Sequence, residues 1–214
     1  MWLHDLLQRG DWIQIISWTF WVIFSICLHE LAHGWAALWQ GDTTPQKLGR
    51  MTMNPLVHMG PVSLLVFLML GIAWGVMPVN PSQFRWGRRG RALVAGAGPA
   101  MNLLLVLLTS ILLILLIRFG PGEGLLSRNL KTFLETGIFL NLILAAFNLL
   151  PVPPLDGSGI LSGLSQRAHT FLQNPQNQYI GFFIIMAIWF TGMFDLFFSL
   201  SSRFVAFVHH LAGG

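Results

Sequence analysis

The chain has 214 residues, of which 54% are hydrophobic and 9% are charged, against roughly 25% charged residues in a typical soluble domain. This composition excludes a water-soluble globule, a disordered chain and a collagen-like protein, and it predicts an integral membrane protein. The net charge of +4 comes from 12 Lys and Arg against 8 Asp and Glu. Because the basic residues lie in loops between apolar runs, they fit membrane orientation and no nucleic-acid partner.

A membrane-spanning helix needs about 20 mostly apolar residues, and four stretches of the chain qualify. They are Trp12–Trp39, Ala92–Ile117, Thr132–Leu150 and Tyr179–Leu200. A fifth stretch, Val62–Met77, is shorter, follows Gly60-Pro61, and could either cross the membrane or re-enter it. Nothing marks a second soluble domain, so we expect residues 1–214 to form one all-α membrane domain with about four spans.

The first predicted span contains His29-Glu30-Leu31-Ala32-His33. Two histidines at positions i and i+4 lie on one face of a helix and can bind one tetrahedral metal. The glutamate between them is placed to accept a proton from water at that metal. Ionisable groups inside a bilayer are costly unless they are paired or bind a metal. The pattern therefore predicts one catalytic Zn²⁺ ion held by His29 and His33, with Glu30 as a base.

A catalytic zinc usually has three protein ligands, so one more is required. Cys27 points to a different face from His29, Glu135 is expected near an interface, and the role of Asp195 is open. Asp156 is the best candidate, because the prolines that precede it interrupt the helix and let the chain turn a carboxylate inward.

The position of the metal also bears on topology. His29 lies about 27 Å along its helix from Asp11, near the far end of the span. Asp156 lies on the same side of the membrane only if Val62–Met77 enters the membrane and leaves it on the side where it began. The re-entrant topology also places seven basic residues on the metal side and five on the other, whereas a crossing segment gives equal numbers. The positive-inside rule then puts the metal near the cytoplasmic face.

Five segments in order resemble one known family. They are His29–His33, Gly49-Arg50-Met-Thr-Met-Asn54-Pro55-Leu-Val-His58, Pro78-Val-Asn-Pro81, Ala97-Gly98-Pro99-Ala-Met-Asn102 and Asn148-Leu-Leu-Pro-Val-Pro-Pro-Leu-Asp156-Gly157. Together they are similar to the site-2 protease family of intramembrane zinc metalloproteases, most of all to its compact prokaryotic branch without PDZ or CBS domains. The resemblance spans roughly residues 25 to 165.

The resemblance implies a zinc endopeptidase that cuts transmembrane segments of other proteins, often to release regulators. It implies that His29, His33 and Asp156 bind zinc and that Glu30 is the catalytic acid and base. Asn148 would hold the substrate backbone or the tetrahedral intermediate; the alternative is a hydrogen bond to Asn141. A prokaryotic cell membrane is the expected location.

Other residues are expected to contact the substrate, which must unwind because a helix hides its peptide bonds. A short β-hairpin-like region, from Leu48–Asn54 and Gly75–Asn80, could hold the unwound segment by strand addition; ordinary loops are the alternative. Asn54 and His58 lie in or near this region, and His58 could instead make a polar contact or approach the zinc. Asn102 is either a contact between helices or a substrate-binding residue.

Two other classes of function compete with a protease. A metal-handling membrane protein could use the same ligands, but it would not need a base at Glu30. A catalytically inactive scaffold could bind transmembrane helices without cutting them, but it would not need an intact ligand set. The basic cluster Arg85, Arg88, Arg89 and Arg91 is expected to anchor the chain to anionic lipid headgroups.

Overall fold

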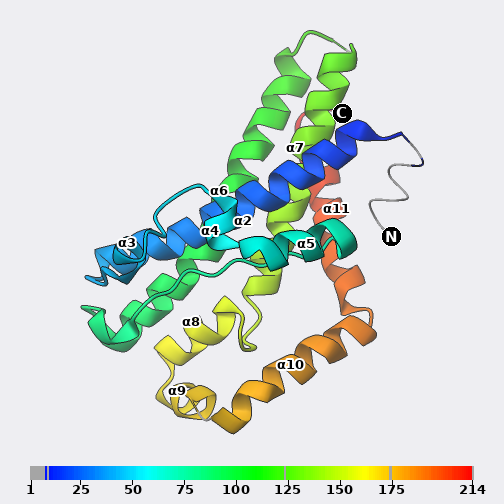
Figure 1. Ribbon diagram of the computed structural model, residues 1–214. Helices are drawn as coiled ribbons and strands as arrows, with labels where there is room; N and C mark the ends of the chain where they lie inside the picture. The colour runs from blue at the N-terminus through cyan, green and yellow to red at the C-terminus, as the bar shows by residue number, and fades with distance from the viewer. Residues whose placement is uncertain (1–7, 9, 123, 174, 214) are drawn as a thin grey trace.

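A computed structural model describes residues 8, 10–122, 124–173 and 175–213, and Figure 1 shows the arrangement of its helices. Three long helices form its centre: α2 (Trp12–Trp39), α6 (Gly87–Phe119) and α7 (Leu125–Asn148). The shorter elements are α3 (Thr44–Lys47), α4 (Pro55–His58), α5 (Gly60–Leu70), the 3-10 turn η1 (Pro81–Gln83), α8 (Asp156–Leu164), α9 (Gln166–Gln173), α10 (Pro175–Phe190) and α11 (Met193–Leu211).

Three helices among the described residues are long and apolar enough to cross a membrane, namely α2, α6 and α7. The expectation of about four spans is therefore wrong. The predicted span Tyr179–Leu200 is divided into α10 and α11 at Gly192, whose φ of 71° lies in the left-handed region that ends helices. After this break, α11 begins with Asp195 in its first turn, where the positive end of the helix dipole stabilises a carboxylate.

The chain reverses direction after α5. Gly71, with a φ of 76°, ends α5 in the left-handed conformation, and the following residues run back beside the helix. The Trp74 N–H donates to Ser63 Oγ (2.9 Å), and the Ser63 hydroxyl donates to the Trp74 carbonyl (2.7 Å). Further along, the Val76 N–H donates to the carbonyl of His58 (3.0 Å). The run predicted at Val62–Met77 is thus an 11-residue helix followed by a returning segment.

The expected β-hairpin is wrong, because neither Leu48–Asn54 nor Gly75–Asn80 forms a strand in the part of the chain that the structure describes. Single contacts take the place of a ladder of hydrogen bonds. The Asn80 N–H donates to the Asp42 carboxylate (2.6 Å), and Pro78 has no N–H to offer. The side chain of Asn54 caps the start of α4.

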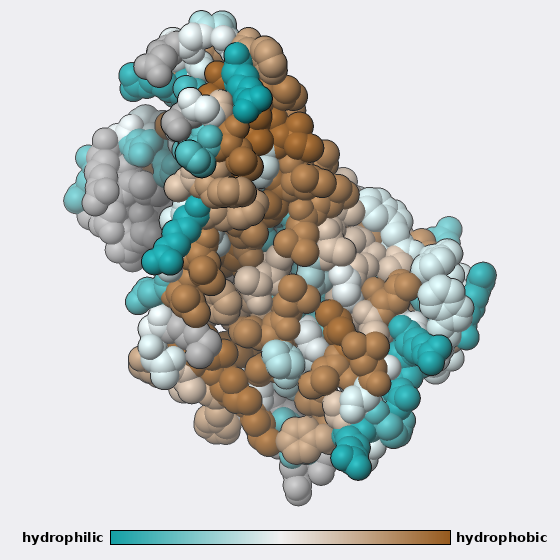
Figure 2. Space-filling view, turned by 180° about the vertical axis from the view of Figure 1, so that it is seen from behind, coloured by the Kyte–Doolittle hydropathy of each residue, from teal (hydrophilic) through white to brown (hydrophobic). Residues whose placement is uncertain are grey.

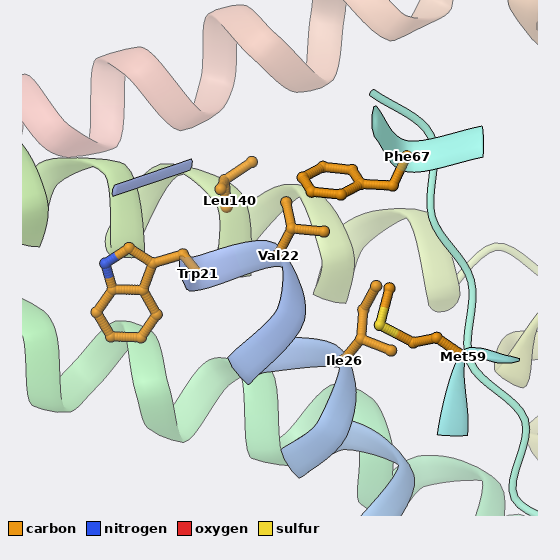
Figure 3. Close-up of a cluster of buried hydrophobic side chains, with 6 residues drawn as sticks. All are labelled: Trp21, Val22, Ile26, Met59, Phe67 and Leu140. Carbon is orange, nitrogen blue, oxygen red and sulfur yellow. The ribbon is translucent and has the colours of Figure 1, made fainter. Parts of the chain in front are cut away.

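The core is the mutual packing of α2, α6 and α7. One apolar cluster joins α2 to α5 and α7 and consists of Trp21, Val22, Ile26, Met59, Phe67 and Leu140; Figure 3 shows Phe67 directed toward Val22. A second cluster joins α6, α7 and α11 around Leu113 and Ile138. Apolar side chains cover much of the face in Figure 2, with hydrophilic ones mostly toward its edges. This surface is what a lipid-facing helical bundle requires.

Candidate metal centre

Two elements that are distant in sequence supply the ionisable groups of one buried cluster. His29, Glu30 and His33 lie in the C-terminal half of α2, and Asp156 is the first residue of α8. The Nε2 atoms of His29 and His33 are 3.1 Å apart. The carboxylate of Asp156 lies 3.0 Å from Nε2 of His29 and 3.3 Å from Nε2 of His33. The structure thus brings together the three residues that the sequence analysis selected as ligands.

The other nitrogen of each histidine ring contacts α6. Nδ1 of His33 lies 2.7 Å from the carbonyl oxygen of Val94, which can only accept a hydrogen bond. His33 therefore carries its proton on Nδ1. This contact leaves the Nε2 lone pair of His33 directed toward the cluster.

A relay of amides fixes the His29 ring in the same way. The carbonyl of Gly137 accepts from Asn141 Nδ2 (2.9 Å), so the Asn141 amide oxygen faces Asn102. That oxygen accepts from Asn102 Nδ2 (2.9 Å), so Oδ1 of Asn102 faces His29. Oδ1 lies 2.6 Å from His29 Nδ1, which must donate. Because each step depends on the one before, a main-chain carbonyl of α7 determines which nitrogen of His29 holds the proton.

These proton positions test whether the residues fit a metal. In their neutral form the two rings direct unprotonated Nε2 atoms at the carboxylate of Asp156, and Oδ2 of Asp156 is buried without a hydrogen bond from any described residue. Lone pairs at this separation repel unless a cation lies between them. The ligand-to-ligand separation in a tetrahedral zinc site is about 3.3 Å for bonds of about 2.0–2.1 Å. The two Nε2 atoms are 3.1 Å apart, Oδ2 of Asp156 lies 3.0 Å from His29, and Oδ1 lies 3.3 Å from His33. The donor set and its spacing fit zinc.

Gly98 of α6 keeps the same space open. A Cβ atom at this position would lie 2.4 Å from Nε2 of His33 and 2.5 Å from Nε2 of His29. Any side chain at residue 98 would therefore overlap the two nitrogens that face the cluster. The small residue serves the site as well as the packing of helices.

A cavity of about 630 Å³ opens onto the cluster. Glu30, Asn148 and Arg91 line it together with residues of the returning segment 73–79 and of α8. Glu30 packs against that segment: a Cβ on Gly75 would lie 2.7 Å from both Cγ and Oε1 of Glu30. The carboxylate of Glu30 is therefore held beside the ligands and at the wall of the cavity.

Asn148 lies at the C-terminal end of α7 and lines the cavity. One N–H of its amide donates to the carbonyl of Leu144 (3.0 Å), which leaves the second N–H available. The alternative hydrogen bond to Asn141 is not formed, because Asn141 bonds Gly137 and Asn102 instead.

The remaining predicted site residues lie outside the cavity lining. Asn102 is fully buried behind His29 as its hydrogen-bond partner. Asn54 caps α4. His58 is buried, and its Nε2 N–H donates to the Thr52 carbonyl (2.6 Å).

Of the other ligand candidates, Cys27 is a buried thiol outside the cluster, and Glu135 pairs with His209 of α11 (2.7 Å). The supporting roles of Val94 and Asn141 were not predicted from the sequence. Val94 acts through its main chain and gives no sequence signal. Asn141 was visible as a polar residue in an apolar run.

Comparisons with known proteins agree on one family. A sequence model of peptidase family M50 matches residues 114–191. "Putative zinc metalloprotease YwhC" of Bacillus subtilis is 37% identical over 174 residues, which are 80% of this chain and 79% of the relative. "Putative zinc metalloprotease Rip2" of Mycolicibacterium smegmatis is 31% identical over 204 residues, or 92% of this chain and 74% of the relative. An archaeal relative, "Putative zinc metalloprotease MJ0611" of Methanocaldococcus jannaschii, is 34% identical over 103 residues, 48% of this chain and 49% of its own length. No solved structure matches the chain significantly.

Proposed function

The chain belongs to peptidase family M50, and we propose that it cuts peptide bonds within or near the transmembrane segments of other membrane proteins. It is a zinc metalloprotease and an integral membrane protein. The observation that carries the proposal is the placement of the His-His-Asp cluster and Glu30 on one cavity between helices long enough to span a membrane.

His29, His33 and Asp156 would hold the zinc ion. The chemistry that a zinc ion would supply there is polarisation of the scissile carbonyl and activation of water as a nucleophile at neutral pH. The protein's own contribution is orientation: Val94 and Asn102 fix the two rings so that each Nε2 faces Asp156.

Glu30 and Asn148 act on the substrate. Glu30 accepts a proton from the attacking water and delivers it to the leaving amine. Because its carboxylate is confined between α2 and Gly75, it stays beside the reacting atoms. Asn148 lines the same cavity, and the N–H that does not bond to Leu144 stabilises negative charge on the carbonyl oxygen during attack.

The substrate is a transmembrane segment that unwinds before it reaches the cavity, since every peptide group of a helix in lipid is hydrogen-bonded internally. The walls that meet it are the returning segment 73–79 and the start of α8. The ligands lie toward the end of α2 that contacts Arg85 through Gln40. This end is rich in arginine, which supports a position near the cytoplasmic face of a prokaryotic cell membrane and a role in releasing membrane-tethered regulators.

The test is cleavage of a panel of single-span substrates by purified protein in detergent. We expect cleavage by the wild type that is lost with a zinc chelator and in Glu30→Gln, and restored by added zinc in the wild type only. Zinc content measured on both proteins separates loss of chemistry from loss of metal. Cleavage that persists in Glu30→Gln would contradict the mechanism. Bound zinc and bound substrate without cleavage would instead favour an inactive scaffold.

Asn148→Ala tests the second catalytic role. Loss of a donor to a developing oxyanion costs about 10²–10³ in kcat, and Asn148 touches none of the ligands. We expect that loss with full zinc content and an unchanged KM. An equal loss of zinc would assign Asn148 to the metal site instead.

A further inference from the structure

One arginine of the basic cluster differs from the others. Arg85, Arg88 and Arg89 are exposed, and Arg88 donates to the side chain of Gln166. Arg91 is half-buried and lines the cavity that contains the metal cluster. Its guanidinium makes no hydrogen bond or ion pair with any described residue. A lipid anchor accounts for the exposed members but not for a cation in the wall of the cavity.

Helix geometry fixes where Arg91 lies relative to the cluster. Arg91 and Gly98 are seven residues apart on α6, which is about two turns, so they share one face. Gly98 touches both histidine rings. Arg91 therefore lies about 10.5 Å along the helix axis from the cluster, on the side of the α6 N-terminus. Helical side chains lean toward the N-terminus, which moves the guanidinium farther from the metal.

The charges of the cavity leave Arg91 without compensation. A zinc ion is balanced by the carboxylates of Asp156 and Glu30, which both line the same space. With those charges balanced, the guanidinium of Arg91 gives the cavity a net positive charge. A partly desolvated arginine with no partner favours a carboxylate, which it can bind in a bidentate manner.

We propose that Arg91 is a specificity-determining residue whose guanidinium binds an Asp or Glu side chain of the substrate. An extended peptide advances about 3.3 Å per residue, so the acidic residue lies about three to five positions from the cleaved bond. This proposal rests on the proposed function in taking a peptide as the occupant of the cavity.

The test measures binding separately from cleavage. Labelled single-span peptides carry one Glu, moved position by position from the centre of the segment, and a matched series carries Gln. Each peptide is titrated by fluorescence anisotropy into zinc-loaded Glu30→Gln protein in neutral detergent. We expect Glu to improve the Kd by about tenfold at one or two adjacent positions, the size of a charge-assisted hydrogen bond.

Arg91→Gln, made in the same background, should abolish this preference, and Arg89→Gln should retain it, because Arg89 belongs to the same cluster but lies outside the cavity. Arg91→Glu should prefer a peptide with Lys at the same position. Zinc content and thermal unfolding show that each variant is folded.

A preference for Glu that survives Arg91→Gln would overturn the proposal, and so would the absence of any preference in peptides that bind. Loss of phosphatidylglycerol binding in Arg91→Gln, with unchanged peptide binding, would assign Arg91 to a lipid headgroup instead. If peptide binding depends on Arg91 but the wild type does not cleave, the proposed function would be contradicted and the proposed role of Arg91 in binding would stand.

Discussion

At Gly98 the backbone of α6 approaches the two histidine rings so closely that no side chain fits between them. The metal centre therefore requires glycine at this position. The rings are held by hydrogen bonds at Nδ1 on one side and are free at Nε2 on the other. Their Nε2 atoms therefore cannot move away from a new methyl group without breaking the contacts that orient them. The space that Gly98 leaves beside the Nε2 atoms and the Nδ1 hydrogen bonds of the two rings therefore act together.

Gly98→Ala is expected to lower zinc affinity by at least about tenfold, the smaller loss seen when a supporting group of a metal site is removed. The measurement is zinc retained after dialysis against a competing chelator. Gly96→Ala is the matched control on the same helix, because its Cβ would meet only Ile160 Cδ1 at 3.9 Å. Equal zinc retention in both variants would show that Gly98 has no part in the site.

The ligands could be predicted from sequence because their signals are local. Spacing along a single helix places His29 and His33 on one face, and prolines mark the turn before Asp156. The partners that fix the rings could not be predicted, because Val94 contributes a main-chain carbonyl and the role of Asn102 depends on Asn141 of another helix. Such contacts exist only after the helices have packed.

Among the elements, the returning segment between Gly71 and Asn80 joins the fold to the chemistry. It is fixed at Trp74 by Ser63, at Val76 by His58 and at Asn80 by Asp42. Between the first two points, Gly75 rests on Glu30. The strand expected here does not form, since alternate extended residues need a neighbouring strand, and these N–H groups bond to a side chain or to an isolated carbonyl instead.

Gly75→Ala should displace the Glu30 carboxylate, because the added Cβ would lie 2.7 Å from it and 2.8 Å from Ile26 Cγ2. We expect kcat to fall by about tenfold or more, part of what a positioned base contributes, with zinc content unchanged. Steady-state cleavage with parallel metal analysis measures both. Ile72→Ala, at an exposed residue of the same segment that does not line the cavity, should keep kcat near that of the wild type. An equal loss in both variants would assign the effect to the segment as a whole.

At the scale of the whole molecule, the crossing of α2 and α7 determines how the histidines of α2 are placed relative to Asp156, which follows α7. Gly137 lets Trp21 approach, since a Cβ there would lie 2.5 Å from the indole. The Trp21 N–H donates to the Phe133 carbonyl (2.8 Å), which fixes the same crossing. The helix that carries the histidines is thus held against the helix that leads to Asp156.

Gly137→Ala should destabilise the folded protein by about 1–3 kcal/mol, the usual cost of overpacking. Unfolding in detergent, followed by circular dichroism with and without zinc, measures the change. Gly96→Ala again serves as the control. Unchanged stability in Gly137→Ala would mean that the two helices can separate without cost.

The apolar runs located the three central helices, because composition along one helix is a local property. The helix α2 begins and ends where its run does, whereas α6 and α7 begin five and seven residues before their predicted runs. The last predicted span was wrong because the signal for its division is one glycine, Gly192, in an otherwise apolar run. Hydropathy averaged over a window does not detect a single left-handed residue.

The separation of the ligands along the chain has a consequence for biosynthesis. His29 and His33 emerge from the ribosome more than a hundred residues before Asp156. At about 5–20 residues per second, the two histidines wait on the order of ten seconds for their third partner. Throughout that interval the nascent chain holds the base and two ligands but no complete zinc site. The enzyme therefore passes through the insertion machinery, among unfolded membrane segments of the kind it is proposed to cut, before it is able to cut them.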